Sequence, residues 1–196
     1  MRIGIYGGTF NPPHLGHLIT AEHVREEAKL DRILFIPSFI SPHKRQGEEG
    51  NAEDRLAMTR LAIEGNPFFE CSDYEVRKGD VSYTVETLGH LLRSRPDAAF
   101  SVIIGMDNYR TLDAWKDPAK ILERSEIIVM NRAAVAEGKP AGISDDRIRF
   151  IPVPDIELSS SAIRRRVREG LSIRYLVPRT VEQYILTHHL YREEKE

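Results

Sequence analysis

The sequence predicts an α/β fold in which a doubly wound, mostly parallel sheet is covered by helices on both faces. Short runs rich in β-branched residues alternate along the chain with segments whose apolar residues recur every three to four positions. Such alternation requires right-handed crossovers and produces a mostly parallel sheet. The length of 196 residues, 41% of them hydrophobic, suffices for one domain with a sizeable core.

The first half of the chain alternates strand and helix. The apolar run Arg2–Tyr6 predicts a strand, and a turn-rich stretch follows it. Apolar residues at helical spacing predict an amphipathic helix over Leu15–Leu30. The run Ile33–Ile36, which ends at a proline, predicts the second strand. After a polar loop we expect a helix over Ala52–Glu64 and a third strand over Phe69–Val76.

The second half continues the alternation. We expect a helix over Thr84–Arg93 and a strand over Ala99–Ile104 that ends at a glycine. Two more strands are predicted over Ile127–Met130 and Ile148–Val153, followed by a helix that begins near Ser160 and a last helix over Val181–His188. We therefore expect a single domain, 1–196, with an α/β core over 1–158 and a small C-terminal helical part over 159–196.

Composition excludes several classes of protein. The 28 Lys and Arg residues against 30 Asp and Glu give a net charge of −2, which argues against a general nucleic-acid binder. The single cysteine, Cys71, cannot form an internal disulfide or a zinc ribbon. Apolar runs are far shorter than the roughly 20 residues of a membrane-spanning helix, and no signal-peptide region follows Met1. We expect a soluble, cytoplasmic protein that binds neither nucleic acid nor membrane.

The turn after the first expected strand carries the strongest chemical signal. Gly7 and Gly8 allow a ligand to approach the backbone closely. His14 and His17 are three residues apart at the head of the expected helix, so both rings project from the same side of its first turn. Free N–H groups and the helix dipole suit phosphate there. Two imidazoles would add a cationic or hydrogen-bond-donating cup for a charged transition state.

Other interpretations of this turn were weighed against that one. A glycine pair after a strand can be a turn and nothing more, and two histidines three apart can be half of a metal site. No Cys, His or Glu follows at ligand spacing, so we assign no metal-ligating residue. The spacing also differs from that of the dinucleotide fingerprint G-x-G-x-x-G and from that of the P-loop.

The run GGTFNPPHLGH at residues 7–17 resembles the signature of the nucleotidyltransferase superfamily that has the H-x-G-H motif. It is most similar to that of the bacterial nicotinate-nucleotide adenylyltransferases, which join nicotinate mononucleotide to ATP. The resemblance implies a Rossmann-like, nucleotide-binding fold. It also implies ATP contacts for the segment Gly8–Phe10 (Gly8, Thr9 and Phe10) and for His17, with His14 and His17 in catalysis.

A second informative stretch, SSSAIR at residues 159–164, lies far along the chain. Serines are good helix N-caps, whereas the helix dipole disfavours a cation such as Arg164 near the first turn. An anion that bridges Arg164 and the helix start would explain this arrangement. The stretch is similar to the superfamily motif S-S-[ST]-x-[IL]-R, which contacts the ATP triphosphate and stabilises the leaving pyrophosphate. This implies ATP contacts for Ser160, Ser161 and Arg164, whereas Arg165, Arg166 and Arg168 are read as a solvated face.

The segments between these motifs resemble the nicotinate enzymes in particular. The run SPHK at residues 41–44 matches their loop that ends in P-H-[KR]. This implies that Lys44 binds a substrate phosphate or the triphosphate and assists catalysis; without the resemblance it is a solvated loop lysine. The run SYT at residues 82–84 resembles a motif whose threonine lies at the pyridine carboxylate. On its own, Thr84 is interpreted as a helix N-cap.

Residues beyond the fourth expected strand extend the resemblance. Gly105 and Asp107 match the family's G-x-D, which implies close approach of adenosine and a bond to a ribose hydroxyl. The only tryptophan, Trp115, matches the one that stacks on nicotinate, although a lone tryptophan is more often a core residue. Lys116 follows Trp115 at a position where the family often has an aromatic residue. In the family the backbone N–H at this position holds the pyridine carboxylate. The resemblance therefore implies that Lys116 binds the substrate. Asn131 and Arg132 resemble the family's [KN]-R pair, which implies that Arg132 lies near the adenosine and phosphates.

The resemblance implies transfer of AMP from ATP to nicotinate mononucleotide, with pyrophosphate as the leaving group and Mg²⁺ carried by ATP, mostly through water. A phosphate monoester is already ionised near neutral pH, so neither a general base nor a covalent nucleophile is required. Two alternatives stay open, a phosphopantetheine adenylyltransferase and a non-catalytic nucleotide sensor on the same fold. The preference for acid over amide also stays open, and a homo-oligomer is compatible with the sequence.

Overall fold

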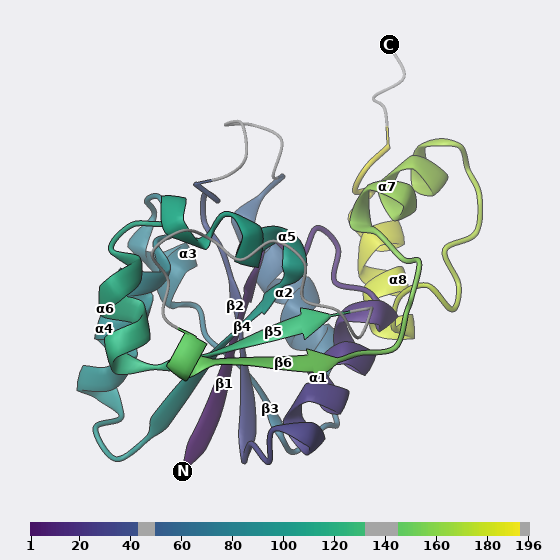
Figure 1. Ribbon diagram of the computed structural model, residues 1–196. Coiled ribbons are helices and arrows are strands. Elements are labelled where there is room, and N and C mark those ends of the chain that lie inside the picture. Colours follow the sequence, from purple (N-terminus) through teal and green to yellow (C-terminus); the bar gives the residue numbers. More distant parts are fainter. Residues whose placement is uncertain (43–49, 132–144, 193–196) are drawn as a thin grey trace.

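The computed structural model describes residues 1–42, 50–131 and 145–192, so the predicted site residues Lys44 and Arg132 lie outside the described residues. Six parallel strands form one sheet in the order β3-β2-β1-β4-β5-β6 (Figure 1). They are β1 (Arg2–Gly8), β2 (Arg32–Pro37), β3 (Phe69–Cys71), β4 (Ala99–Gly105), β5 (Glu126–Asn131) and β6 (Ile148–Pro152). The order of the strands reverses between β1 and β4, which is where ligands bind in doubly wound sheets.

Helices cover both faces of the sheet, as predicted (Figure 1). They are α1 (Leu15–Glu27), α2 (Ala52–Ile63), α3 (Tyr74–Lys78), α4 (Thr84–Ser94), α5 (Met106–Arg110), α6 (Pro118–Arg124), α7 (Ser160–Arg168) and α8 (Arg179–Thr187), with 3-10 turns η1 (Leu112–Ala114) and η2 (Asp145–Arg147). No helix among these described segments is long and apolar enough to cross a membrane.

Alternation along the strands divides the core between the two faces. In β1, Ile3 and Ile5 point into a cluster that α4, α5 and α6 cover. Tyr6 points the other way, into a cluster with residues of α1 and α2. Both faces are buried, which explains why the central strands are near-continuous apolar runs rather than alternating ones.

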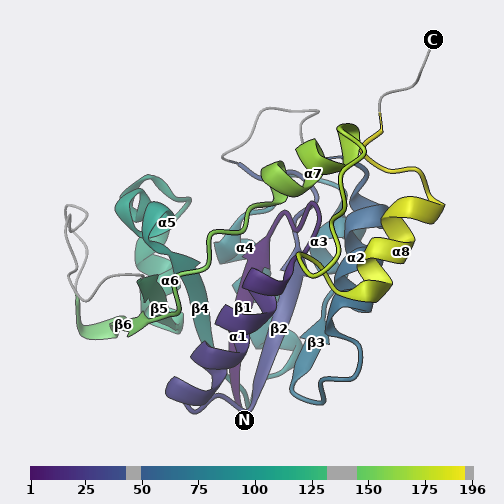
Figure 2. The same cartoon turned by 90° about the vertical axis from the view of Figure 1, so that its right-hand side faces the viewer.

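The C-terminal helices form a third apolar cluster on α2. Met58 of α2, Ile163 of α7 and Ile185 of α8 are all buried in it. Figure 2 shows α7 and α8 beside α2, with α7 lying above the ends of the central strands. The C-terminal segment therefore returns to the carboxyl ends of the strands, where the turn after β1 lies. The division of the chain at residue 158 stays a prediction.

The structure corrects three details of the predicted elements. The third strand ends at Cys71 rather than at Val76, because Tyr74 begins the short helix α3, where its N–H donates to Ser72 Oγ (3.3 Å). The first long helix ends at Glu27 instead of Leu30. The helices α5 and α6 were not predicted, because five and seven residues are too few to display a helical period.

Candidate active site

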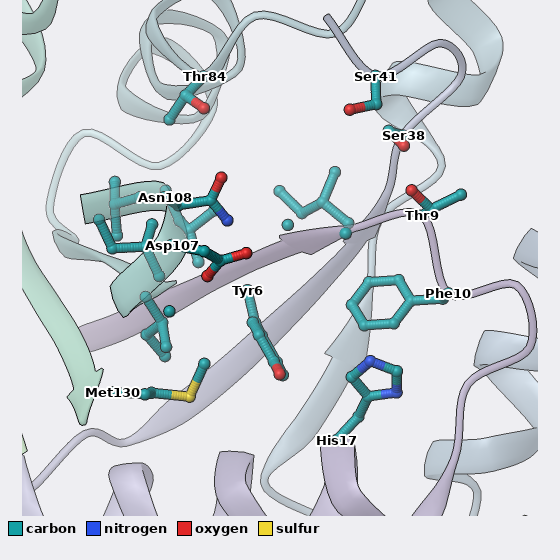
Figure 3. Close-up of a pocket in the computed structure, with 18 of the residues that line it drawn as sticks. Tyr6, Thr9, Phe10, His17, Ser38, Ser41, Thr84, Asp107, Asn108 and Met130 are labelled. Atoms are coloured by element: carbon teal, nitrogen blue, oxygen red, sulfur yellow. The ribbon is translucent and has the colours of Figure 1, made fainter. Parts of the chain in front are cut away.

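A cleft with a volume of about 1180 Å³ lies at the carboxyl ends of the central strands, where the strand order reverses. It is larger than the roughly 300–1,000 Å³ of a typical small-molecule pocket. The predicted site residues that line it are Gly8, Thr9, Phe10, His14, His17, Thr84, Gly105, Asp107, Trp115, Lys116 and Ser160. Figure 3 shows Thr9, Phe10 and His17 on one side of this cleft and Thr84, Asp107 and Asn108 on the other.

The two histidines of the first turn stack on each other at the start of α1. Their ring centroids are 3.6 Å apart and the ring planes differ by 22°. The backbone N–H of His14 donates to Nδ1 of His17 (3.1 Å), so in the neutral ring Nε2 of His17 carries the proton. A side chain on Gly16 would place its Cβ 3.0 Å from Nδ1 of His14. The glycine between the histidines therefore leaves room for the stacked pair.

Burial keeps both imidazoles neutral at physiological pH in the ligand-free protein. Desolvation lowers the pKa of His17 to about 3 and that of His14 to about 4. The ring of Phe10 packs edge-on against His17, with centroids 5.2 Å apart, and helps to exclude water. Of the two modes predicted for this pair, hydrogen-bond donation therefore fits the free site, and a cationic cup does not.

These pKa shifts predict a loss of stability in acid. The unfolded chain takes up protons on both histidines as pH falls through about 6.5, whereas the folded protein keeps them neutral down to about pH 4. The contribution is therefore fully present above pH 6.5 and is lost as the pH falls from there. We expect the free energy of unfolding to drop by about 4 kcal/mol between pH 7.5 and pH 5, about half of it from each histidine. Denaturant titrations of the wild type and of His17→Gln measure this drop, and an equal drop in both would contradict it.

The second predicted motif lies directly against the first. Ser160 Oγ donates to the carbonyl of Pro12 (2.8 Å), and Nη1 of Arg164 donates to the carbonyl of Asn11 (2.7 Å). Ser159 is the N-cap of α7 and accepts from the N–H of Ala162 (3.2 Å). The two stretches, some 150 residues apart in sequence, therefore form one wall, as a site for a single triphosphate requires.

Two predicted ATP ligands, Ser161 and Arg164, do not line the cleft. Arg164 is half-buried, and its Nη2 lies 3.4 Å from Ser161 Oγ, which it can reach only through a long hydrogen bond. Of the predicted solvated arginines, Arg165 and Arg168 are exposed, whereas Arg166 Nε donates to the carbonyl of Ser172 (2.9 Å). Arg166 is half-exposed, and its side chain closes the turn after α7.

The opposite wall brings together the residues predicted to bind the pyridine nucleotide. Thr84 is the first residue of α4 and Tyr83 is the N-cap, so the interpretation of Thr84 as a helix cap is wrong. Trp115 is half-buried: one part packs against the core cluster and another lines the cleft. Nζ of Lys116 lies 2.6 Å from Oε1 of Glu86 and 4.4 Å from the centroid of the Tyr83 ring.

Gly105 and Asp107 form the turn that follows β4. Gly105 is the N-cap of α5, and a Cβ on it would lie 2.7 Å from Oδ1 of Asp107. The absence of a side chain therefore lets the Asp107 carboxylate fold back over the backbone beside the cleft. This geometry is compatible with a bond to a ribose hydroxyl.

Sequence reasoning missed two buried charged residues, of which Glu75 lines the cleft and Arg55 lies behind it. Arg55 is 1% exposed and donates to the carbonyls of Thr9 (2.9 Å), Ser38 (2.6 Å) and Phe39 (2.9 Å). It thereby ties the first turn to the loop after β2. Glu75 is buried and accepts from Thr87 Oγ1 (2.6 Å), and burial raises its pKa. The available signal for Arg55 was its place on the buried face of α2, three and four residues before Met58 and Thr59.

The described residues contain no group of three or more His, Cys, Asp or Glu side chains that could hold a metal ion. Within this part of the chain, the cleft offers the imidazoles of His14 and His17 on one wall and an aromatic ring and hydroxyls on the other. Such an arrangement suits an anionic ligand that carries flat rings.

Comparisons with known proteins place this geometry in a family. Residues 5–166 match the family described as cytidylyltransferase-like. A protein of Salinibacter ruber, named a probable nicotinate-nucleotide adenylyltransferase, is 43% identical over 194 residues, which cover 98% of this chain and 98% of that protein. A protein of the same name from Thermomicrobium roseum is 42% identical over 198 residues, covering 97% of this chain and 92% of that protein.

A solved structure shares the fold. The Plasmodium falciparum nicotinic acid mononucleotide adenylyltransferase complexed with NaAD superposes with a TM-score of 0.76 at 18% identity, over 97% of each chain. The similarity in sequence covers nearly the full length of the two bacterial relatives, and it includes both motif stretches that meet at the cleft. This chain therefore belongs to the family of nicotinate-nucleotide adenylyltransferases.

Proposed function

We propose that the protein transfers the adenylyl group of ATP to nicotinate mononucleotide, which yields nicotinate adenine dinucleotide and pyrophosphate in NAD biosynthesis. The observation that carries this proposal is the meeting of two phosphate-binding stretches at one wall of a cleft. The other wall presents Thr84 and Trp115, a hydroxyl and an aromatic ring that suit a pyridine carboxylate and its ring. Family membership supports the same reaction.

The chemistry requires positioning and charge stabilisation. An oxygen of the 5′-phosphate of nicotinate mononucleotide attacks the α-phosphorus of ATP, and a new P–O bond forms as the bond to pyrophosphate breaks. His14 and His17 donate hydrogen bonds to the α-phosphate, and the dipole at the start of α1 adds to this field. Because they stand fixed before the charge develops, these donors need no reorganisation during the reaction.

The remaining predicted residues keep subsidiary roles in this proposal. Lys44 and Arg164 assist with phosphate charge, and Lys116 offers its backbone N–H to the pyridine carboxylate. The ATP contacts are assigned to Gly8, Thr9, Phe10, Gly105, Asp107, Arg132, Ser160 and Ser161. Several of these assignments draw on the family motifs, and each can be tested by substitution.

We also infer that ATP enters with Mg²⁺. Mg²⁺ gives up its water reluctantly and is usually bound through substrate phosphates and one or two carboxylates, so we expect ATP rather than a protein cage to carry the ion. When bound, such an ion neutralises charge on the triphosphate. The residues of the site then bind and orient the nucleotides around it.

Replacing Trp115 by alanine is expected to raise KM for nicotinate mononucleotide about tenfold, because ring stacking contributes roughly 1–3 kcal/mol. KM for ATP should change less than about threefold, because the two stretches assigned to the triphosphate lie on the other wall. Steady-state kinetics with each substrate varied in turn measures the difference. Trp115→Phe keeps a stacking ring and should recover most of the loss. An equal rise in both KM values would mean that Trp115 serves the core alone.

The proposed function is tested by pyrophosphate release from Mg-ATP with three acceptors offered in parallel. They are nicotinate mononucleotide, nicotinamide mononucleotide and phosphopantetheine. Strong release with the first, lost when the metal is chelated, is the expected result. Release with phosphopantetheine alone would keep the chemistry and overturn the assignments of Thr84 and Trp115. If ATP binds and no acceptor is used, the protein is a nucleotide sensor.

A further inference from the structure

A small charged network joins two segments of the pyridine wall. Oε1 of Glu86 lies 2.6 Å from Nζ of Lys116, and Oε2 of the same carboxylate accepts from Nζ of Lys78. The ammonium of Lys116 also lies over the ring of Tyr83, 4.4 Å from its centroid. We call these four residues the Lys116 latch. The two ammonium groups lower the pKa of Glu86, so its carboxylate stays ionised at neutral pH.

The latch connects parts of the chain that each carry a predicted pyridine-binding residue. Lys116 follows Trp115 in the segment between η1 and α6, whereas Tyr83 and Glu86 flank Thr84 at the start of α4. Figure 1 shows α4 and α6 side by side on one face of the sheet. The contacts of Lys116 therefore run directly from the tryptophan segment to the threonine segment.

The tryptophan segment is positioned by packing against the core and by the contacts of Lys116. Leu112 before it and Ile121 after it are fully buried, but Asp113, Ala114 and Lys116 are exposed. The backbone N–H of Trp115 donates to the carbonyl of Leu112 (3.2 Å) in the turn before it. Besides the core packing of Trp115, the contact of Lys116 with Glu86 attaches the exposed part of this segment to α4.

We propose that Lys116 is a positioning residue that holds Trp115 at the distance from Thr84 that suits a pyridine ring. The proposal rests on the proposed function, since it deepens the assignment of this wall to the pyridine nucleotide. Isolated surface ion pairs contribute little, but here one carboxylate binds two ammonium groups and one of these also contacts a ring. Glu86 offsets the charge of Lys116, so the lysine acts through position rather than by attracting the substrate carboxylate.

A double-mutant cycle tests the latch. Lys116→Met keeps the aliphatic stem and removes the charge, and Glu86→Gln keeps the shape of the acceptor and removes its charge. We expect each variant to raise KM for nicotinate mononucleotide about three- to fivefold and to change KM for ATP less than about twofold. The double variant should be no worse than either single variant, because both substitutions open the same contact. Lys120→Met is the matched control, since Lys120 pairs with Asp117 and does not line the cleft.

Two kinetic outcomes would overturn the proposal. If Lys116 attracted the substrate carboxylate by charge, Glu86→Gln would free the ammonium and lower KM instead of raising it. If the two residues acted independently, their effects on KM would multiply in the double variant. Measuring KM for nicotinamide mononucleotide adds a further criterion, because a positional effect weakens binding of the acid and the amide alike.

Fluorescence tests the latch without any turnover. Trp115 is the only tryptophan of the chain, so its emission reports on this segment alone. In the ligand-free protein we expect acrylamide to quench Trp115 more strongly in Lys116→Met and Glu86→Gln than in the wild type or Lys120→Met. Unchanged quenching in both variants would overturn the latch. Absence of pyrophosphate release in the wild type would refute the proposed function and would leave the quenching result interpretable.

Discussion

Replacing His17 by alanine is expected to lower turnover by a factor of about 10² or more, while ATP binding weakens far less. The imidazole of His17 stacks on that of His14, and its Nδ1 accepts a hydrogen bond from the backbone N–H of His14 (3.1 Å), so its orientation is fixed. Only Nε2 is left to meet a substrate, and burial keeps it a neutral donor. A fixed donor stabilises the charge that develops in the transition state more than it stabilises bound ATP.

Two further variants separate catalysis from folding. His17→Gln retains an acceptor for the N–H of His14, as glutamine does at this position of a capping box, but does not restore the ring. It should keep the thermal stability of the wild type while turnover stays low. His23→Ala on the same helix serves as the control, since its ring bonds the carbonyl of Pro152 and does not line the cleft. Near-normal turnover of His17→Ala would remove His17 from the site.

The sequence was sufficient for most of the fold because each long element carries its own periodic signal. Central strands such as Ile33–Ile36 and Ile127–Met130 are buried on both faces and read as continuous apolar runs. The strand expected over Phe69–Val76 is wrong beyond Cys71, because the chain turns into the short helix α3 at Tyr74. The apolar Val76 is buried there by a helical turn rather than by a strand.

The candidate site was predictable where its residues are neighbours in sequence, as in the histidine turn. It was not predictable where the fold alone creates the neighbours. Arg55 reaches Thr9 and Ser38 across 46 and 17 residues, and no local pattern encodes those contacts. The neutral state of His17 is likewise a consequence of burial, which spacing does not reveal.

Arg164 illustrates how structure changes the meaning of a motif residue. The sequence places it as an anion ligand near the start of a helix, where a cation is otherwise disfavoured. In the structure one N–H of its guanidinium is bonded to the carbonyl of Asn11, which fixes the side chain against the first turn. Of its five N–H groups, the described contacts use one more, toward Ser161. In the proposed reaction, the other donors would bind the leaving pyrophosphate.

We therefore expect Arg164→Ala to lower turnover about 10²-fold, because it removes both a charge-assisted contact to the leaving group and the fastening of the first turn. Arg164→Lys should recover only part of this loss, since a single ammonium cannot bond Asn11 and a phosphate as a guanidinium fork does. Arg165→Ala is the matched control, because Arg165 is the neighbouring arginine of α7 and its side chain is exposed. If Arg164→Ala and Arg165→Ala have equal, small effects on turnover, the arginine fastens two stretches of chain together and takes no part in the transfer.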